Sequence, residues 1–228
     1  MNQTENPIPA SQLLDLRLAE SEAVGAIHAA IEPRLAIALR DQVSRLKPKT
    51  AIEIGMANGI STLAILAGLP AGSRLISIDP YQDTEWASAG RKLVARCDRA
   101  ADHTILTEPD YLALPAMLRD GAQVDFAYID GMHTFDYVAL DAFFVDKLLP
   151  VGGVVAFNDC GFRSIHKFLK MFQSHRKYEE LDVGLVPDYR GRNPLVTAVR
   201  RITGRSNQDR YFRKLEQWEP PHNFFRPF

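Results

Sequence analysis

Hydrophobic positions in the first part of the chain recur with helical spacing. Between residues 11 and 47, apolar side chains return every three or four positions, with charged residues between them. This is the pattern of amphipathic helices. Pro33 lies inside the segment and is expected to separate two helices. The pattern predicts an N-terminal helical extension over residues 1–47.

From residue 48 onward, short apolar runs alternate with helical segments. Short apolar runs bounded by glycine, proline or polar residues are typical of buried strands, and five occur, at residues 50–54, 74–78, 103–106, 124–129 and 154–157. Helices are expected between them, at residues 61–69, 85–97, 111–119 and 135–149. This alternation implies right-handed βαβ units. The sequence predicts a single α/β domain with a doubly wound, Rossmann-like, mostly parallel sheet of about seven strands and helices on both faces.

The pattern weakens after residue 160. A helix is expected at residues 165–172, and residues 178–186 and 195–199 are candidates for a final pair of strands. Residues 186–214 hold eight basic side chains against two acidic ones, which favours a solvated loop. The alternative is a clamp for an anionic substrate or a membrane-facing patch. We expect the main domain to span residues 48–200, with residues 201–228 as a basic and aromatic tail packing on it.

Composition narrows the class of protein. The chain of 228 residues is 46% hydrophobic and 24% charged, which excludes wholesale disorder. A net charge of −1 gives no global attraction to nucleic acid. Two cysteines, Cys97 and Cys160, are too few for a disulfide scaffold and favour a reducing compartment. Residues 1–9 lack the features of a secretory signal, and the apolar window at 54–73 is interrupted by glycine, asparagine and proline, so a cytoplasmic protein without a membrane span is expected.

A glycine-containing loop follows the first predicted strand. The segment reads Glu53-Ile-Gly55-Met56-Ala57-Asn58-Gly59-Ile-Ser61. Such glycines let the backbone approach a ligand closely, and the following helix offers unpaired N–H groups. The glycine spacing differs from the dinucleotide fingerprint, and no phosphate-loop lysine follows. A ligand loop and a plain tight turn both remain open from this segment alone.

An acidic residue ends the second predicted strand. Asp79 is followed by Pro80 and Tyr81. In a doubly wound sheet this position lies beside the first loop, where a carboxylate can accept the ribose hydroxyls of an adenosine ligand. The alternative is an exposed turn aspartate before a proline. Combined with the glycine loop, the ligand interpretation is favoured.

Polar residues also end the fourth and fifth predicted strands. Asp130 follows one strand, and Asn158 and Asp159 follow the next. Two carboxylates and an amide form an oxygen donor set that suits Mg²⁺ or Ca²⁺, whereas the alternative is a helix cap and a turn without a metal. His133 lies three residues after Asp130 and is a candidate general base, since imidazole titrates near neutral pH. The alternative for His133 is a loop residue that caps the next helix.

These motifs resemble those of the class I S-adenosylmethionine-dependent methyltransferases over roughly residues 48–160. The block from Glu53 to Thr62 resembles the first motif of that family, and Asp79 resembles its ribose-binding acid. The closest similarity is to the metal-dependent O-methyltransferases, of both the catechol type and the macrolide-sugar and antibiotic branch. The sugar branch is favoured by the run Asp130-Gly131-Met132-His133 followed by Phe135, Val138 and Asp141.

The resemblance implies a role for each matched residue. Gly55 and Gly59 would admit the methionine part of the cofactor, Ser61 would hold its carboxylate, Asp79 would bind the ribose, and Asp110 would lie near the adenine. The full cofactor-binding set implied is Glu53, Gly55, Met56, Ala57, Asn58, Gly59, Ser61, Asp79, Pro80, Tyr81, Asp110 and Asp130.

The same resemblance implies the catalytic machinery. Asp130 and His133 would be catalytic, with His133 as the general base, and Asp130, Asn158 and Asp159 would be the metal ligands. One departure occurs: the pair after the fifth strand is Asn-Asp here, whereas the family usually has Asp-Asn or Asp-Asp.

The predicted function is methyl transfer from S-adenosylmethionine to a hydroxyl of a small molecule, a sugar, glycan or other diol, with Mg²⁺ as the candidate metal. The expected partner is this small substrate, without nucleic acid, and a homodimer is a candidate assembly. Two alternatives are a nicotinamide-dependent oxidoreductase on the same type of sheet and a non-catalytic S-adenosylmethionine-binding module.

Overall fold

A computed structural model of the chain describes residues 6–24 and 31–228. The predicted N-terminal extension therefore falls partly outside the described residues, at 1–5 and 25–30. Contacts within the chain define two compact units, Met1–Pro109 and Asp110–Phe228. The strand order is β3-β2-β1-β4-β5-β7-β6. The prediction of an α/β fold with a mostly parallel sheet of about seven strands is confirmed.

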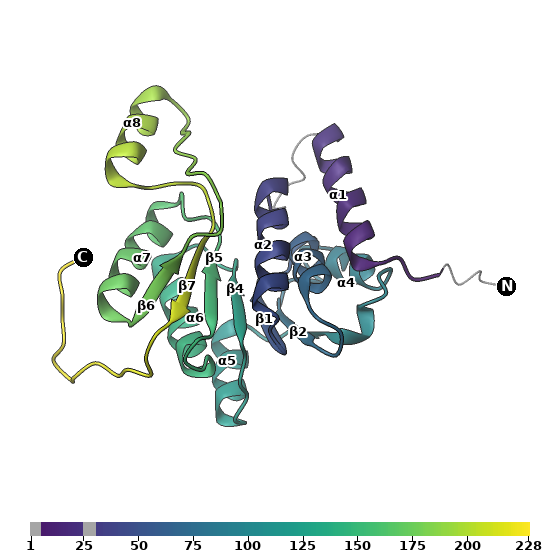
Figure 1. Cartoon of the computed structure of the whole chain (residues 1–228), viewed down its shortest axis with the longest axis horizontal. Coiled ribbons are helices and arrows are strands. Elements are labelled where there is room, and N and C mark those ends of the chain that lie inside the picture. The colour runs from purple at the N-terminus through teal and green to yellow at the C-terminus, as the bar shows by residue number, and fades with distance from the viewer. Residues whose placement is uncertain (1–5, 25–30) are drawn as a thin grey trace. The chain divides into compact units, whose positions relative to one another are not determined.

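The first unit contains strands β1 to β3 and the helices that connect and precede them (Figure 1). Its elements are α1 (Ala10–Val24), α2 (Pro33–Leu46), β1 (Thr50–Ile54), α3 (Ile60–Gly68), β2 (Arg74–Ile78), α4 (Ala89–Val94), the 3₁₀ helix η1 (Ala100–Asp102) and β3 (His103–Leu106). Strand β2 pairs in parallel with both β1 and β3. Helix α3 packs against α1 and α2. A Cβ added at Gly68 would lie 2.4 Å from the carbonyl oxygen of Arg40, so glycine is required where α3 meets α2.

The predicted helix at residues 85–97 is shorter in the structure. Helix α4 begins only at Ala89, because Ala87 and Ser88 adopt left-handed backbone conformations with φ of 47° and 58°. A left-handed residue interrupts a right-handed helix. Residues 80–88 therefore form turns rather than the first half of a helix.

The second unit combines parallel and antiparallel strands. Its elements are α5 (Asp110–Arg119), β4 (Phe126–Ile129), α6 (Phe135–Leu148), β5 (Val154–Phe157), α7 (Arg163–His175), β6 (Tyr178–Leu181), α8 (Pro194–Thr203) and β7 (Arg210–Lys214). Strand β5 pairs in parallel with β4, and β7 pairs antiparallel with β5 and β6. The rings of Phe157, Phe168, Phe172 and Phe212 pack together with centroid distances of 5.5 to 6.0 Å and form an aromatic core.

The prediction that residues 195–199 form a strand is wrong, because they lie in α8. Pro194 occupies the first turn of this helix, and the side chain of Asn193 caps it by accepting a hydrogen bond of 2.9 Å from the amide of Val196. Gly204 ends the helix in a left-handed conformation with φ of 71°. Proline at the start, an asparagine cap and a terminal glycine are standard helix boundaries, and they outweigh the β-branched residues between them.

Strand β7 lies inside the basic segment that the sequence presents as a solvated loop, so that interpretation is wrong for residues 210–214. The buried residues Tyr211 and Phe212 supply its apolar contacts. Its charges are compensated by β6: Arg210 makes two hydrogen bonds of 2.6 Å to Glu180, and Arg213 makes one of 3.1 Å to Glu179. Charged cross-strand pairs hide the strand pattern from a hydrophobicity scan.

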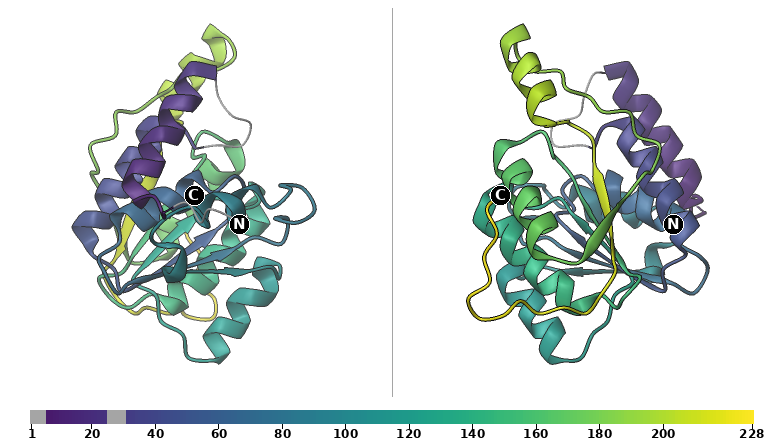
Figure 2. Two further views of the ribbon diagram at one scale, coloured as in Figure 1. Left: turned by 90° about the vertical axis from the view of Figure 1, so that its right-hand side faces the viewer. Right: turned by 60° about the vertical axis from the view of Figure 1, so that its left-hand side comes forward.

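The aromatic residues after β7 return to α7 (Figure 2). The ring of His175, the last residue of α7, lies 5.4, 5.9 and 5.8 Å from the rings of Phe224, Phe225 and Phe228. Within residues 6–24 and 31–228, no helix combines the length and the apolar character needed to cross a bilayer.

Candidate functional site

The loop after β1 has the strained geometry expected of a ligand-binding turn. Gly55 and Gly59 have φ of 88° and 80°, and Ala57 also has a positive φ of 45°. A Cβ at Gly59 would lie only 3.0 Å from the Cα of Gly90, so glycine is required there for close approach as well as for conformation. A non-glycine residue with positive φ is uncommon and persists where the surroundings hold it. The backbone of this loop is therefore held in one defined conformation.

Asp79 is the residue that fixes this loop. Its Oδ2 accepts hydrogen bonds from the amides of Met56 and Ala57, at 3.2 and 2.8 Å, and its Oδ1 accepts one from the amide of Tyr81 at 2.8 Å. The residue is only 3% exposed. The expected neighbourhood of Asp79 and the first loop is confirmed, because Ile54 and Ile78 are paired across β1 and β2. Its role as a ribose ligand stays a prediction.

Gln82 also holds the loop after β1 and Asp79 in place, a role that the sequence did not indicate. Its Nε2 donates to the carbonyl oxygen of Ala57 at 2.7 Å and to Oδ2 of Asp79 at 2.9 Å. The side chain is fully buried. A glutamine inside a polar turn carries no signal of burial by its spacing, so only the folded structure shows this role. The remaining predicted neighbour in this turn, Tyr81, is 45% exposed.

Glu53 is buried beneath the same loop and anchors three elements. Its carboxylate accepts hydrogen bonds from the hydroxyls of Ser61 (2.6 Å), Thr62 (2.7 Å) and Ser77 (2.6 Å). Ser77 also lies 2.9 Å from Nε2 of His103. The network ties β1 to the first turn of α3 and to β2. Ser61 uses its hydroxyl proton on Glu53, so binding a cofactor carboxylate through this proton would require an exchange of partner.

Asp110, predicted to lie near the adenine, starts α5 and lies close to a second buried acid. Its Oδ1 accepts a hydrogen bond of 2.7 Å from the amide of Tyr111. Asp141 of α6 is fully buried, and neither of its carboxylate oxygens has a hydrogen-bond partner among the described residues. Burial, together with the negative charge of Asp110, raises the pKa of Asp141 to about 8. Asp141 therefore holds a proton at neutral pH.

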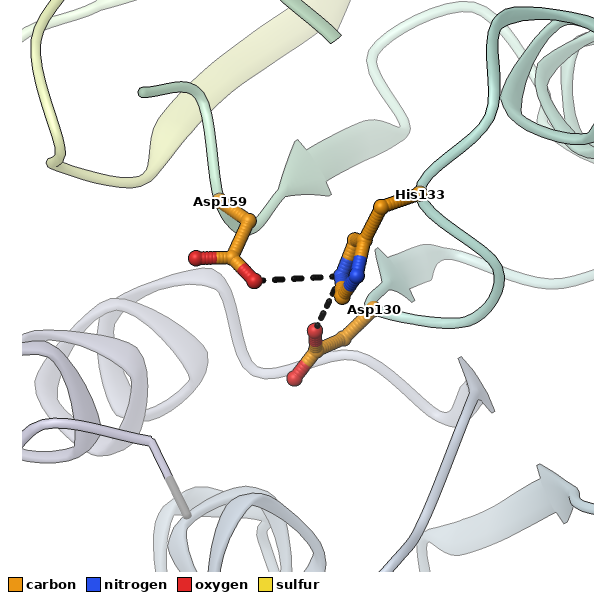
Figure 3. Close-up of side chains that lie close together, drawn as sticks. All are labelled: Asp130, His133 and Asp159. Atoms are coloured by element: carbon orange, nitrogen blue, oxygen red, sulfur yellow. Dashed lines mark hydrogen bonds and ion pairs between the residues drawn. The ribbon is translucent and has the colours of Figure 1, made fainter. Parts of the chain in front are cut away.

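Three side chains at the ends of β4 and β5 converge on one point (Figure 3). Nε2 of His133 lies 3.3 Å from Oδ1 of Asp130 and 3.2 Å from Oδ2 of Asp159. One ligand atom from each residue lies within 4.8 Å of the others. Strand pairing explains the convergence, because Ile129 and Phe157 are opposite each other in the parallel β4–β5 ladder. The predicted proximity of these strand ends is confirmed.

The environment of the cluster shifts its proton equilibria. Burial raises the pKa of Asp130 to about 6, against the opposing effect of His133. Burial also disfavours the charged form of His133, but its hydrogen bond to Asp130 and the charges of Asp159 and Asp130 outweigh this effect, so its pKa is raised. The pKa values of both residues are thus shifted upward, and perturbed values in one cluster are typical of acid–base sites.

Asn158 takes part in a buried hydrogen-bond network that the sequence did not indicate. Its Nδ2 donates to Oδ1 of Asp209 at 2.9 Å and to the hydroxyl oxygen of Tyr128 at 3.0 Å. The Tyr128 hydroxyl in turn donates to Oδ2 of Asp209 at 3.0 Å. Burial raises the pKa of Asp209 well above its ordinary value. Asp209 lies far along the chain from the motif and was missed for that reason.

The first turn of α7 holds the backbone of His133. The Ser164 hydroxyl donates to the His133 carbonyl oxygen at 2.5 Å, and the ring of Phe162 lies 5.2 Å from the imidazole. These two contacts restrict the orientation of the histidine. Neither residue belongs to a recognisable motif, so the sequence did not single them out.

The donor atoms of the cluster match the requirements of a divalent cation in part. Asp130 and Asp159 supply two converging carboxylates, which are ligands that Mg²⁺ accepts. Asn158 donates through its amide nitrogen to Asp209 and Tyr128, so its amide oxygen is the atom that would bind a cation, and its role as a metal ligand stays a prediction. The two aspartates therefore fit a cation, and the imidazole between them offers an alternative counter-charge when it is protonated.

A family comparison agrees with this geometry. Residues 52–160 match the family model described as a methyltransferase domain. The matched segment runs from β1 to the residues just after β5 and so includes the glycine loop, Asp79 and the Asp130–His133–Asp159 cluster. The resemblance to the class I S-adenosylmethionine-dependent methyltransferases is confirmed over these residues.

The individual relatives described next share less than 30% sequence identity with this chain. A curated caffeoyl-CoA O-methyltransferase from Stellaria longipes is 27% identical over 117 residues, which are 50% of this chain and 47% of the relative. The match thus spans about half the length of the curated relative. Two solved structures share the fold: the O-methyltransferase TomG from Streptomyces achromogenes in complex with SAM (TM-score 0.68, 16% identity, 90% of each chain) and an O-methyltransferase from Bacillus cereus in complex with SAH (TM-score 0.67, 15% identity, 90% of this chain and 91% of that one).

Proposed function

We propose that this protein is an S-adenosylmethionine-dependent O-methyltransferase that acts on a small molecule with a vicinal diol, either a sugar or glycan unit or a catechol. One observation carries the proposal: Asp130 and Asp159 converge on Nε2 of His133 at 3.3 and 3.2 Å, directly after two paired strands. The methyltransferase family match and the O-methyltransferase relatives support the choice of reaction.

The first unit would bind the cofactor. Gly55 and Gly59 have no side chains to block a ligand, and α3 begins at Ile60 with Gly59 as its N-cap, so no side chain caps the helix. An uncapped helix start favours a carboxylate, such as the one on the methionine part. Oδ1 of Asp79 accepts a single hydrogen bond, from Tyr81, so its remaining acceptor capacity suits a ribose hydroxyl.

His133 would act as the general base in the second unit. An acceptor hydroxyl transfers its proton to the imidazole as its oxygen forms a bond to the methyl carbon, and the carbon–sulfur bond of the donor breaks. Asp130 and Asp159 then stabilise the imidazolium, which is the effect that already raises the pKa of His133. General-base assistance of this kind contributes about 10²–10⁴-fold in rate.

A divalent cation fits beside the base as an aid to the same step. Asp130 and Asp159 would hold it, and such an ion lowers the pKa of a bound hydroxyl and fixes its position. A vicinal diol would present two oxygens to it. Alignment of the acceptor oxygen with the methyl group is a further large contribution to rate.

Labelled methyl transfer tests the proposal directly. The folded protein is incubated with methyl-labelled S-adenosylmethionine and a panel of catechols and sugar diols, with and without a chelator. Label on an acceptor oxygen is the expected result, and loss of transfer in the chelator identifies metal assistance. Binding of S-adenosylhomocysteine without transfer to any hydroxyl acceptor would contradict the proposal and favour a non-catalytic binding module.

A further inference from the structure

A cavity of about 400 Å³ lies between α7 and the end of α8, outside the site described above. Helix α8 contributes Val199 and Thr203 to its wall. The rest of the lining is basic: Arg163, His166, Lys167, Lys170 and Arg205. None of the lining residues is acidic, so the cavity concentrates positive charge in a chain whose net charge is only −1.

The positive charge of the cavity is uncompensated. Within residues 6–24 and 31–228, the four arginine and lysine side chains of the lining form no ion pair, whereas nearby Arg210 is paired with Glu180 at 2.6 Å. Arg163, Lys167 and Lys170 follow one another at helical spacing on one side of α7. Like charges at such spacing repel one another and destabilise a helix. A bound anion would relieve this repulsion.

Buried nitrogen atoms at the cavity lack partners. His166 is 9% exposed, and neither its Nε2 nor Nε of Arg205 has a hydrogen-bond partner in the described part of the chain. A buried polar group without a partner is destabilising, and a ligand that supplies the missing hydrogen bond removes this cost. Burial and the charges of Lys170, Arg210, Arg205 and Lys167 lower the pKa of His166, so the surroundings of this ring are cationic throughout.

The wall on the α8 side is held by specific contacts. Arg200 donates to Oδ1 of Asn207 at 2.6 Å and to the carbonyl oxygen of Gly161 at 3.5 Å. A Cβ at Gly161 would lie 2.1 Å from Oδ1 of Asn207, so glycine is needed where this segment meets the start of α7. Gly204, in its left-handed conformation, turns the chain back and brings Arg205 to the cavity. The cavity is therefore built by the fold.

We propose that this cavity binds a phosphate group, carried either by a soluble phosphate ester or by an anionic lipid headgroup. Several guanidinium and ammonium groups around one concave site match the multiple charges and oxygens of a phosphate. A lipid source is relevant because α8, which lines the cavity with Val199, exposes the apolar side chains of Leu195, Val199 and Ile202 by 74%, 45% and 85%. The proposal does not depend on the methyl-transfer activity.

Arg163 is the cavity residue that is nearest in sequence to the contacts of His133. It lies between Phe162 and Ser164, which both contact His133. At the start of α7, Arg163 therefore lines the cavity, while its neighbours Phe162 and Ser164 contact His133. A phosphate ester bound there would be held within the same unit as the base.

Calorimetry with inorganic pyrophosphate tests the site on the full chain. Wild-type protein is expected to bind saturably, and Lys167→Gln/Arg205→Gln should weaken binding by about tenfold or more, since charge-assisted hydrogen bonds are lost. The matched control is Arg192→Gln/Arg201→Gln, which removes the same charge from exposed positions outside the cavity. If the first double variant unfolds, Lys170→Gln replaces it.

A second experiment, with lipid vesicles, distinguishes a lipid headgroup from a soluble phosphate ester. Vesicles of phosphatidylcholine with 30% phosphatidylglycerol, about an ordinary anionic fraction, are sedimented with the same variants. Vesicle binding lost only in the cavity variant identifies a lipid headgroup, and pyrophosphate binding without vesicle binding identifies a soluble ester. Equal losses in both double variants, or binding of neither probe by the wild type, would overturn the proposal.

Discussion

The carboxylates discussed above differ between the two compact units in their hydrogen bonding and in their pKa values. In Met1–Pro109, Glu53 and Asp79 accept hydrogen bonds from three hydroxyls and from three backbone amides and the Gln82 amide, respectively. In Asp110–Phe228, burial raises the pKa of Asp130 to about 6 and that of Asp141 to about 8, and it also raises the pKa of Asp209 well above its ordinary value. The first unit uses acids to fix backbone, whereas the second contains acids whose pKa values are shifted upward.

The difference indicates that the two units contribute separate parts of the function. A carboxylate surrounded by donors is a rigid anchor, because each bond must break before the loop can move. A carboxylate with few donors and high burial changes its protonation instead. Ligand positioning therefore belongs to the glycine loop, and proton transfer belongs to the cluster around His133.

The largest expected effect comes from removing the base. His133→Ala should lower kcat for methyl transfer by about 10²–10⁴-fold while the affinity for S-adenosylhomocysteine stays within about twofold, since this residue lies outside the glycine loop. The control is His222→Ala, because His222 is exposed. Unchanged kcat in His133→Ala would break the proposed division between the units.

The next effect concerns the anchor in the first unit. Glu53→Ala would leave the hydroxyls of Ser61, Thr62 and Ser77 without their acceptor and open a cavity, so we expect a loss of about 2–4 kcal/mol in the free energy of unfolding. Urea unfolding measures it. The exposed Glu85 provides the control, and Glu85→Ala should change stability by less than about 0.5 kcal/mol. Equal free energies of unfolding for Glu53→Ala and Glu85→Ala would contradict the anchoring role of Glu53.

A smaller effect is a pH dependence in the second unit. The pKa of Asp141 is raised from 3.8 to about 8 by burial and Asp110, so the folded chain holds a proton that the unfolded chain releases. Stability should fall as pH rises between about 5 and 8, by up to about 1.4 kcal/mol per pH unit.

Asp141→Asn should remove that part of the slope, because an amide keeps the shape without the titration. Asp120→Asn, at a side chain that is 67% exposed, is the control and should leave the slope unchanged. Thermal melts over this pH range compare the three proteins. Parallel curves for wild type and Asp141→Asn would show that Asp141 is ionised in the folded state.

The sequence was sufficient where apolar runs were short and clearly bounded. Strands β1 to β5 and the residues that follow them could be predicted, because the carboxyl ends of parallel neighbours must meet. This is why Asp79 was expected beside the loop and Asp130 near Asp159. The predictions failed where charge hid burial: β7 contains two arginines and a buried lysine, Lys214, which donates to backbone oxygens of Asp146 and Leu149.

The rest of the site could not be predicted because its members are distant in sequence or have no typical pattern. Asp209 reaches Asn158 and Tyr128 only through the antiparallel pairing of β5 and β7. Gln82 reaches Asp79 through a turn set by left-handed residues. The amide nitrogen of Asn158 faces Asp209, a choice between two orientations that spacing alone does not encode.

Calorimetry with S-adenosylhomocysteine tests the central claim most directly. The account predicts one binding site on the wild-type chain, affinity lowered by about tenfold in Asp79→Asn through the lost carboxylate, and unchanged affinity in Asp15→Asn, whose side chain is 68% exposed. NADH, titrated in parallel, should not bind. A folded wild-type protein that binds NADH, or that fails to bind S-adenosylhomocysteine, would contradict the account.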